Sequence, residues 1–345
     1  MFYFHHINCI SPQKTFSEID LEHINTPVGD KLLSVEPAYE GIPLNILRRM
    51  GKAVRMGVGA ALKITRQNPD GIIIGTANGG MEDCIKFLNQ VIDYNEGMLT
   101  PTNFVQSTTN AIASQIGLMS ANKGYNCTHV HRGLAFENAL LDTAMLLREN
   151  HGHQYLLGGI DEISAYNYNI EFLEGCFKKE KITGIDLYKT NTAGTIAGEG
   201  SVMFLANNNP AGASGKLIAL RMLHCYDEND VAEELKKFIR SHFPVSEQPD
   251  VFFSGENGDN RLQKYYDACE QAFNKETAVV HFKHVSGEYA TVSAFAAWLA
   301  CHVLQTQKLP MHFLKYAHSK NHFKNILVYN NYRGLQHSFM LISAS

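Results

Sequence analysis

Short apolar runs of strand length alternate with longer stretches of helical periodicity along the whole chain. In the first half, Gly71–Gly75 predicts a buried strand that leads through a glycine-rich turn into a helix at 81–92. The segment 125–147 repeats this order with Gly133 at its turn, and a further strand is predicted at 155–159. Strands that alternate with helices in this way indicate layered α/β architecture.

The second half of the chain shows a similar series. Strands predicted at 250–253 and 277–281 are each followed by a turn and a helix, and two closing strands are predicted at 325–329 and 337–343. The turn at Gly133 then matches the turn at Gly287, since each opens a helix at a corresponding place. We therefore expect two duplicated halves, residues 1–205 and 206–345, with a site between them.

The composition of the 345 residues is that of an ordinary globular protein, with 45% hydrophobic residues and a formal net charge of −4. This balance argues against a nucleic-acid partner. No run of about 18 apolar residues predicts a membrane span, and no leader pattern is present, so a cytoplasmic location is expected. The seven cysteines are scattered without a CxxC pair. We expect reduced thiols, with no disulfide, no metal site and no cofactor.

Four short motifs follow one another along the chain. They are a basic segment at Arg48–Met50, a glycine-rich turn at Ile74–Gly80, a strand end at Leu157–Glu162 and a Gly-Glu-Gly sequence at Gly198–Gly200. In this order the motifs resemble those of the β-ketoacyl synthases of the thiolase superfamily, and the likeness extends over nearly the whole chain. The resemblance implies an α/β, thiolase-like five-layer αβαβα fold of two duplicated halves, and a dimer.

The catalytic residues of that family are not found at the matching positions. The resemblance places the nucleophilic cysteine at Gly133, the first histidine at Gly255 and the second histidine at Glu288. Glycine offers no nucleophile, and a carboxylate would oppose the negative charge that develops during condensation. Lys283 is retained, but Ala297 stands where the family has a glutamate. These positions predict a chain without catalytic residues of its own.

The loop that gates the acyl site in the family is rich in glycine. Its counterpart in this chain keeps one glycine of three and consists of Asn331, Tyr332, Arg333 and Gly334. Such a loop is expected to be stiffer and bulkier than a glycine-rich one.

A β-ketoacyl-synthase-like chain that lacks the nucleophile and both histidines resembles the chain-length factors. These are the inactive partners of active synthases in type II polyketide and aryl-polyene or flexirubin-type pathways. The resemblance implies a heterodimer with an active β-ketoacyl-ACP synthase, in which this chain shapes the acyl tunnel and meets the acyl carrier protein through the complex. Two alternatives stay open. One is an autonomous condensing enzyme or acyl hydrolase that uses Cys127, Ser286 or Glu288, and the other is a homodimeric acyl-binding scaffold.

Met81, Cys84 and Leu88 are spaced to lie on one face of the predicted helix at 81–92. The resemblance places these side chains at the far end of the acyl tunnel, where their bulk would limit chain length, and places Phe104 near the acyl pocket. The alternative is a buried apolar stripe with a core phenylalanine.

His129, His131 and Arg132 form a basic cluster just before the turn at Gly133. The two histidines would share one side of a strand, which would suit a metal or a proton relay, but no third ligand follows at a motif spacing. We expect instead that the cluster lies at the subunit interface, with Arg132 within reach of Glu137 or of a partner carboxylate. A second basic group could attract an acidic carrier protein or form internal ion pairs, and it consists of Arg48, Arg49, Lys52 and Arg55.

Overall fold

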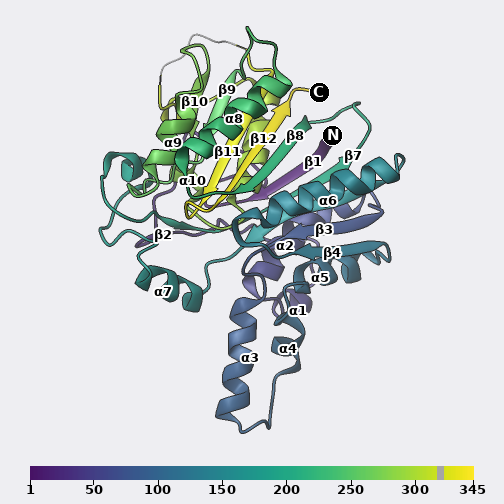
Figure 1. Cartoon of the computed structure of the whole chain (residues 1–345). Coiled ribbons are helices and arrows are strands. Elements are labelled where there is room, and N and C mark those ends of the chain that lie inside the picture. The colour runs from purple at the N-terminus through teal and green to yellow at the C-terminus, as the bar shows by residue number, and fades with distance from the viewer. Residues whose placement is uncertain (317–321) are drawn as a thin grey trace.

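The computed structural model describes residues 1–316 and 322–345, and ten of the twelve strands in this part of the chain fall into two sets of five (Figure 1). The first set has the spatial order β4-β3-β5-β7-β1. Its bounds are β1 Phe2–Ile10, β3 Gly71–Gly75, β4 Tyr125–His129, β5 Gln154–Asp161 and β7 Gly200–Asn207. The three strands from β4 to β5 run parallel, whereas β7 pairs antiparallel with β5 and with β1.

The second set repeats this arrangement strand for strand. Its order is β10-β9-β11-β12-β8, again with three parallel strands followed by two antiparallel pairings. The bounds are β8 Gly215–His224, β9 Val251–Ser254, β10 Ala278–His281, β11 Asn325–Tyr332 and β12 Gln336–Ser343. Counted by position within each half, both sets read third, second, fourth, fifth, first. This identity of order and direction is the duplication that the hydrophobic pattern indicated.

The two halves join through antiparallel pairing of β1 with β8, which makes one ten-stranded sheet of the described residues. The expected division after residue 205 falls inside β7, whose last residue is Asn207. In the structure, the first half gives way to the second in the connection 208–214, between β7 and β8.

Helices form three layers around the two sets of strands. The central layer holds α6 (Ala135–Glu149) and α11 (Val292–Thr306), which pack with strands of both halves in one core. The outer layers are α2 (Lys52–Thr65) and α5 (Ala111–Ser120) on the first half, and α8 (Glu228–His242) and α9 (Gln263–Glu270) on the second. Because α11 is apolar on all sides, it can be buried on all sides. The expected five-layer αβαβα fold is confirmed.

Shorter elements complete the fold. They are β2 (Lys31–Leu32), β6 (Ala197–Gly198), α1 (Leu44–Leu47), α3 (Met81–Asp93), α4 (Pro101–Gln106), α7 (Ala165–Leu173), α10 (Lys283–Ser286), and the 3-10 turns η1 (Arg132–Leu134), η2 (Gly184–Lys189) and η3 (Met311–Phe313). Figure 1 shows α3 and α4 projecting together from the body of the molecule as an arm. None of the helices in the described part of the chain is long and apolar enough to cross a membrane.

Candidate functional site

The turn at Gly133 lies between edge strand β4 and the central helix α6. Arg132 has a φ of +49°, so the strain of this sharp turn falls on the residue before the glycine. A Cβ atom at Gly133 would lie 2.2 Å from Cβ and 2.3 Å from Cγ of Tyr332. The Gly133 amide donates a hydrogen bond of 2.9 Å to the side chain of Gln336. Glycine is therefore the residue that fits here, because Tyr332 fills the space that a larger side chain would need.

Tyr332 is held in place by the β11–β12 hairpin. Arg333 and Gly334 both have positive φ values, +57° and +67°, as in the tight turns that match the twist of antiparallel strands. Asn331 accepts a hydrogen bond of 2.8 Å from the Gly334 amide. The Arg333 guanidinium binds Glu171 at 2.5 Å and Glu174 at 3.0 Å, both from helix α7 or its end. The loop expected to serve as a gate is thus a hydrogen-bonded and ion-paired hairpin.

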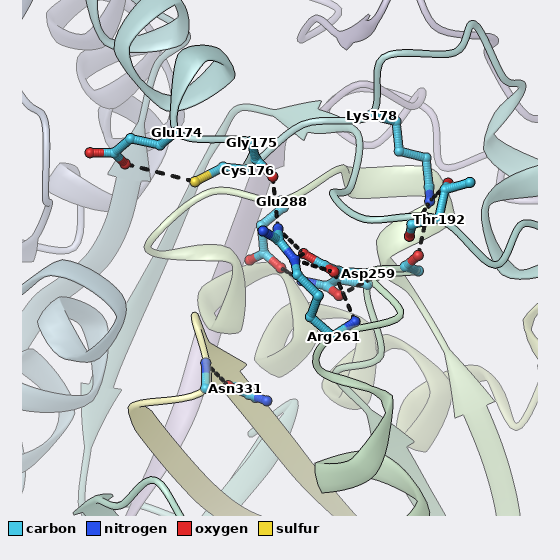
Figure 2. A network of polar contacts seen from close by, with 12 residues as sticks. Glu174, Gly175, Cys176, Lys178, Thr192, Asp259, Arg261, Glu288 and Asn331 are labelled. Carbon is cyan, nitrogen blue, oxygen red and sulfur yellow. Dashed lines mark hydrogen bonds and ion pairs between the residues drawn. The ribbon is translucent and has the colours of Figure 1, made fainter.

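A cavity of about 350 Å³ lies beside this hairpin. Its walls come from both halves: the end of β5, β6, the turn after β9, the turn before α11, and the hairpin itself. Figure 2 shows the polar residues gathered around it. The cavity thus lies between the duplicated halves, where the sequence predicted a site.

A buried ion pair lies at the wall of this cavity. The ammonium of Lys283 is 2.8 Å from a carboxylate oxygen of Glu288, and the Lys283 side chain has no exposed surface. The Asn257 amide donates a hydrogen bond of 2.9 Å to the same oxygen. Burial lowers the pKa of Lys283, and the negative charge of Glu288 opposes that shift. Glu288 is therefore committed to balancing Lys283 and is not a free base.

The turn after β9 presents Asn257 to the cavity, not Gly255. Gly255 packs under the neighbouring strand, where a Cβ atom would lie 2.5 Å from the backbone oxygen of Tyr329. Asn257 lines the cavity and contacts Glu288. Gly258 follows with a φ of +77°, which aims the turn toward η2. Asn257 was not predicted from the sequence, although the glycine directly after it marks the bend in this turn.

The cations around the cavity are already bound to protein oxygens (Figure 2). The Arg261 guanidinium donates hydrogen bonds to both carboxylate oxygens of Asp259, from Nε at 2.9 Å and from Nη2 at 2.5 Å. Nη2 also donates to the Gly175 carbonyl. Lys178 donates to Thr192 and to the Gly258 carbonyl. The positions of Arg261 and Lys178 at this site could not be predicted from the sequence, because both side chains form hydrogen bonds with residues distant in the sequence.

The thiol that lines this cavity belongs to Cys176, whose sulfur lies 3.8 Å from a carboxylate oxygen of Glu174. Burial raises the pKa of Cys176, so the thiol form is favoured over the thiolate. A nucleophilic cysteine needs surroundings that stabilise the thiolate, whereas here burial, together with the charges of Glu171 and Glu174, outweighs the charges of Arg333 and Arg261. Cys176 is not an activated nucleophile in this arrangement.

The three residues considered as displaced catalytic groups have other partners. The Ser286 hydroxyl donates to the Gly287 carbonyl at 2.9 Å and is fully buried. Cys127 lies within β4, contacts His129 and does not line the cavity. Glu288 is paired with Lys283. None of the three combines a nucleophile, a base and access to the cavity.

The basic cluster before Gly133 is divided by the end of the strand. β4 ends at His129, so the expectation that His129 and His131 share one side of a strand is wrong. His129 binds Asp142 at 2.9 Å, whereas His131 binds Asn138 and lies against the His224 ring. The expected contact of Arg132 with Glu137 is not formed within residues 1–316 and 322–345. Glu137 is fully buried and accepts a hydrogen bond from Ser338.

A second hollow, of about 540 Å³, contains His131 and Arg132 in its wall. Tyr332, Arg333 and Asn78 line both this hollow and the cavity of 350 Å³. The hairpin therefore contributes to the walls of both spaces.

The arm carries the four residues expected to line a tunnel. Met81 and Cys84 are half-buried on α3, Leu88 is 53% exposed, and Phe104 on α4 is 60% exposed. The Phe104 ring packs against Phe87 at 5.3 Å between centroids. The alternative of a buried stripe in the core of this chain is therefore wrong: Asp83 is the buried residue of α3. The apolar face of the arm is open to solvent in the single chain.

Two of the scaffold motifs hold buried carboxylates. Asp161, at the end of β5, accepts hydrogen bonds from the amides of Ala77 and Asn78 and from Thr291. Glu199, in the Gly-Glu-Gly motif, accepts from Ser34 and the Ile163 amide and binds Lys52. These carboxylates fasten the glycine-rich turn and the strand ends to each other. For Lys52 and for Arg55, which binds Glu36, the internal ion-pair alternative is confirmed.

Comparison with protein families shows which family part of this chain is similar to. Residues 30–173 match the family described as "Beta-ketoacyl synthase, N-terminal domain". This segment, less than half of the chain, is similar to the N-terminal domain of the β-ketoacyl synthases. No curated protein matched the chain.

Solved β-ketoacyl synthase structures share the whole fold. A β-ketoacyl synthase from Burkholderia phymatum STM815 matches with a TM-score of 0.76 and 12% identity, over 100% of this chain and 99% of that one. A ketosynthase in complex with its chain length factor, from Xenorhabdus doucetiae, matches with a TM-score of 0.77 and 12% identity, over 100% and 98%. A type II polyketide synthase acyl-carrier protein in complex with its ketosynthase matches with a TM-score of 0.71 and 16% identity, over 100% and 99%. The chain therefore has the ketosynthase fold from end to end.

Proposed function

We propose that this chain is a non-catalytic, chain-length-factor-like subunit that pairs with an active β-ketoacyl-ACP synthase. The observation that carries the proposal is the fit of Tyr332 against Gly133. A condensing enzyme needs a thiolate at the start of the central helix to hold the acyl chain. Here that place is occupied by an aromatic ring from a hairpin that ion pairs fix to α7.

The second support is the electrostatics of the cavity. Two neutral or cationic donors are needed to stabilise the carbanion and oxyanion of a decarboxylating condensation. The groups that face each other here are Asn257, Glu288 and Lys283, and the positive charge of Lys283 is balanced by Glu288. Gly133, Gly255 and Glu288 are therefore proposed as vestigial positions.

The exposed apolar arm supports pairing with another chain. Large apolar side chains with more than a third of their surface exposed gather on α3, on α4 and between them, namely Leu88, Ile92, Tyr94, Met98, Phe104 and Val105. Contiguous apolar surface of this kind marks a protein interface. We place Met81, Cys84, Leu88 and Phe104 against an acyl tunnel that continues into the synthase subunit, and His129, His131 and Arg132 near the subunit contact.

The fold of the solved complexes agrees with such an assembly, since they include a ketosynthase with its chain length factor and a ketosynthase with its acyl carrier protein. We infer that the pair elongates acyl chains on a carrier protein, in polyketide or polyene synthesis of the aryl-polyene or flexirubin type, in the cytoplasm. Asn331, Tyr332, Arg333 and Gly334 then form a closed hairpin in place of a gate.

Co-expression with a cysteine-bearing β-ketoacyl synthase encoded beside this chain tests the pairing. We expect the two chains to co-purify as a heterodimer, by affinity capture on either chain followed by light scattering. A matched variant with Leu88→Asp and Phe104→Asp should lose the partner, because charges would be placed on the apolar arm. Exclusive homodimers of this chain would overturn the proposal in favour of the acyl-binding scaffold.

A further inference from the structure

A cluster of donor atoms lies outside the cavity and the Gly133 turn, between edge strand β4 and helix α6. Tyr125, Cys127 and His129 alternate along β4, so their side chains lie on one face of the strand. Helix α6 contributes Asp142 to the same place. Three residues of one strand and one of the helix packed beside it thus converge.

The distances within the cluster are short. The Cys127 sulfur lies 3.7 Å from Nε2 of His129, and the same nitrogen lies 2.9 Å from Oδ2 of Asp142. The Tyr125 hydroxyl donates to Oδ2 of Asp142 at 3.1 Å. The sulfur, the nitrogen and the carboxylate oxygen all lie within 4.8 Å of one another. The side chains of His129 and Asp142 are 27% and 18% exposed, so the cluster is sheltered but accessible.

Hydrogen bonding accounts for only part of this arrangement. A ring nitrogen carries at most one proton, and the proton that Nε2 shares with Asp142 cannot also satisfy the Cys127 sulfur. A metal ion, in contrast, would use the thiolate, the imidazole nitrogen and the carboxylate oxygen together. Within residues 1–316 and 322–345, no lysine or arginine forms an ion pair with Asp142 that would supply a cation in its place.

We propose that Cys127, His129 and Asp142 bind a zinc ion. With zinc bond lengths of about 2.0 to 2.3 Å and tetrahedral angles, sulfur and nitrogen ligands lie about 3.5 Å apart and nitrogen and oxygen ligands about 3.3 Å apart. The observed sulfur–nitrogen and nitrogen–oxygen separations are 3.7 and 2.9 Å, so each of these two pairs lies within about 0.4 Å of the spacing that tetrahedral zinc requires. The mixture of thiolate, imidazole and carboxylate favours Zn²⁺ over Mg²⁺ or Ca²⁺, which prefer oxygen ligands alone.

The fourth zinc position falls to water or to the Tyr125 phenol. Binding deprotonates the Cys127 thiol, whose proton leaves to solvent, and Nε2 of His129 gives up its proton to become a ligand while Nδ1 takes the one proton of the neutral ring. The ion would link edge strand β4 to the central helix α6. This role does not depend on the proposed subunit function.

A second cluster in the molecule shows the contrasting case. Glu256, Glu270 and His281 also gather within metal-binding distance. There the Lys315 ammonium lies 2.6 Å from Glu256 and 3.0 Å from Glu270, so a protein cation already occupies the centre. Because a lysine ammonium already balances the carboxylates of that cluster, and no lysine or arginine in the described residues pairs with Asp142, the cluster on β4 is the better metal site.

Zinc titration of the full-length chain, reduced and stripped of metal, tests the site with a competing chromophoric chelator. We expect one tightly bound Zn²⁺ per chain. Cys127→Ser and Asp142→Asn should each weaken binding by more than about tenfold, the loss that even outer partners of metal ligands produce. Cys225→Ser, at another half-buried cysteine, is the matched control and should bind zinc as the natural chain does.

Cobalt replaces zinc in a second measurement that reports the ligands directly. Co²⁺ bound by the natural chain should show the visible bands of a tetrahedral site and a thiolate charge-transfer band that Cys127→Ser abolishes. Circular dichroism confirms that each variant is folded. Absence of stoichiometric zinc, or equal zinc affinity and an unchanged cobalt spectrum in Cys127→Ser, would overturn the proposal.

Discussion

Gly133 and Tyr332 form a contact between residues about 200 positions apart, and the contact decides which side chain can stand at the helix start. Gly133→Ala should destabilise the chain by about 1 to 3 kcal/mol, because the new Cβ atom would overlap Tyr332. Chemical denaturation measures this loss. Gly152→Ala is the matched control, since a Cβ atom there meets nothing within 4 Å.

The origin of that loss is separable by a double-mutant cycle. In the background of Tyr332→Gly, which removes both the Cβ atom and the ring that a Cβ at Gly133 would meet, Gly133→Ala should cost little, giving a coupling energy of about 0.5 to 3 kcal/mol. If Gly133→Ala is equally destabilising with and without the Tyr332 side chain, that side chain does not determine the glycine.

Glu137 on α6 is fully buried, and one carboxyl oxygen accepts from Ser338 at 2.7 Å. Burial raises the pKa of Glu137 from 4.5 to about 7, although the hydrogen bond from Ser338 opposes the shift. Between these pH values the folded chain retains a proton that the unfolded chain has released, so stability should fall as the pH rises from about 4.5 to about 7.

Glu137→Gln should remove this pH dependence and gain stability over the natural chain, by up to about 3 kcal/mol above pH 7. Urea denaturation at several pH values measures the difference, with Glu276→Gln, at an exposed glutamate, as the control. A constant difference between the Glu137→Gln variant and the natural chain across this pH range would contradict the assignment.

At the scale of elements, the hydrophobic pattern predicted most strands and helices but not all their ends. The apolar run from Ile326 to Tyr329 predicted the end of β11, yet the strand continues to Tyr332 because backbone pairing with β12 tolerates Asn330 and Asn331. The turn predicted after the strand at 277–281 contains the short helix α10, and α4 and α5 lie between the helix predicted at 81–92 and the segment 125–147, where no element was predicted. Such differences come from tertiary pairing, which a local pattern does not record.

The arm formed by α3 and α4 is the element that the proposed tunnel depends on. Leu88→Ala or Met81→Ala, within the complex of this chain and its synthase, should lengthen the acyl product because side-chain volume is removed at the tunnel end. Mass spectrometry of the products measures chain length. Lys86→Ala, on the same helix, is the control and should leave the product unchanged. An unchanged product in Leu88→Ala and Met81→Ala would place these side chains outside the tunnel.

At the scale of the molecule, the duplicated halves and five layers could be predicted because each half repeats the same order of strands and helices. The Gly133 position could be inferred for the same reason. The residues that close the site could not be inferred. Asn257 and Arg261 reach the cavity through turns, and the meeting of Cys127 and His129 with Asp142 requires the packing of β4 on α6. These contacts depend on the arrangement of whole elements.

The central claim is that this chain shapes a site while another subunit holds the acyl group. Intact-protein mass spectrometry after incubation with an acyl-loaded carrier protein tests it most directly, on this chain alone and on its complex with the active synthase. We expect the synthase subunit to gain the mass of the acyl group and this chain to gain none in either sample. Acylation of this chain, or turnover of malonyl carrier protein by this chain alone, would contradict the claim.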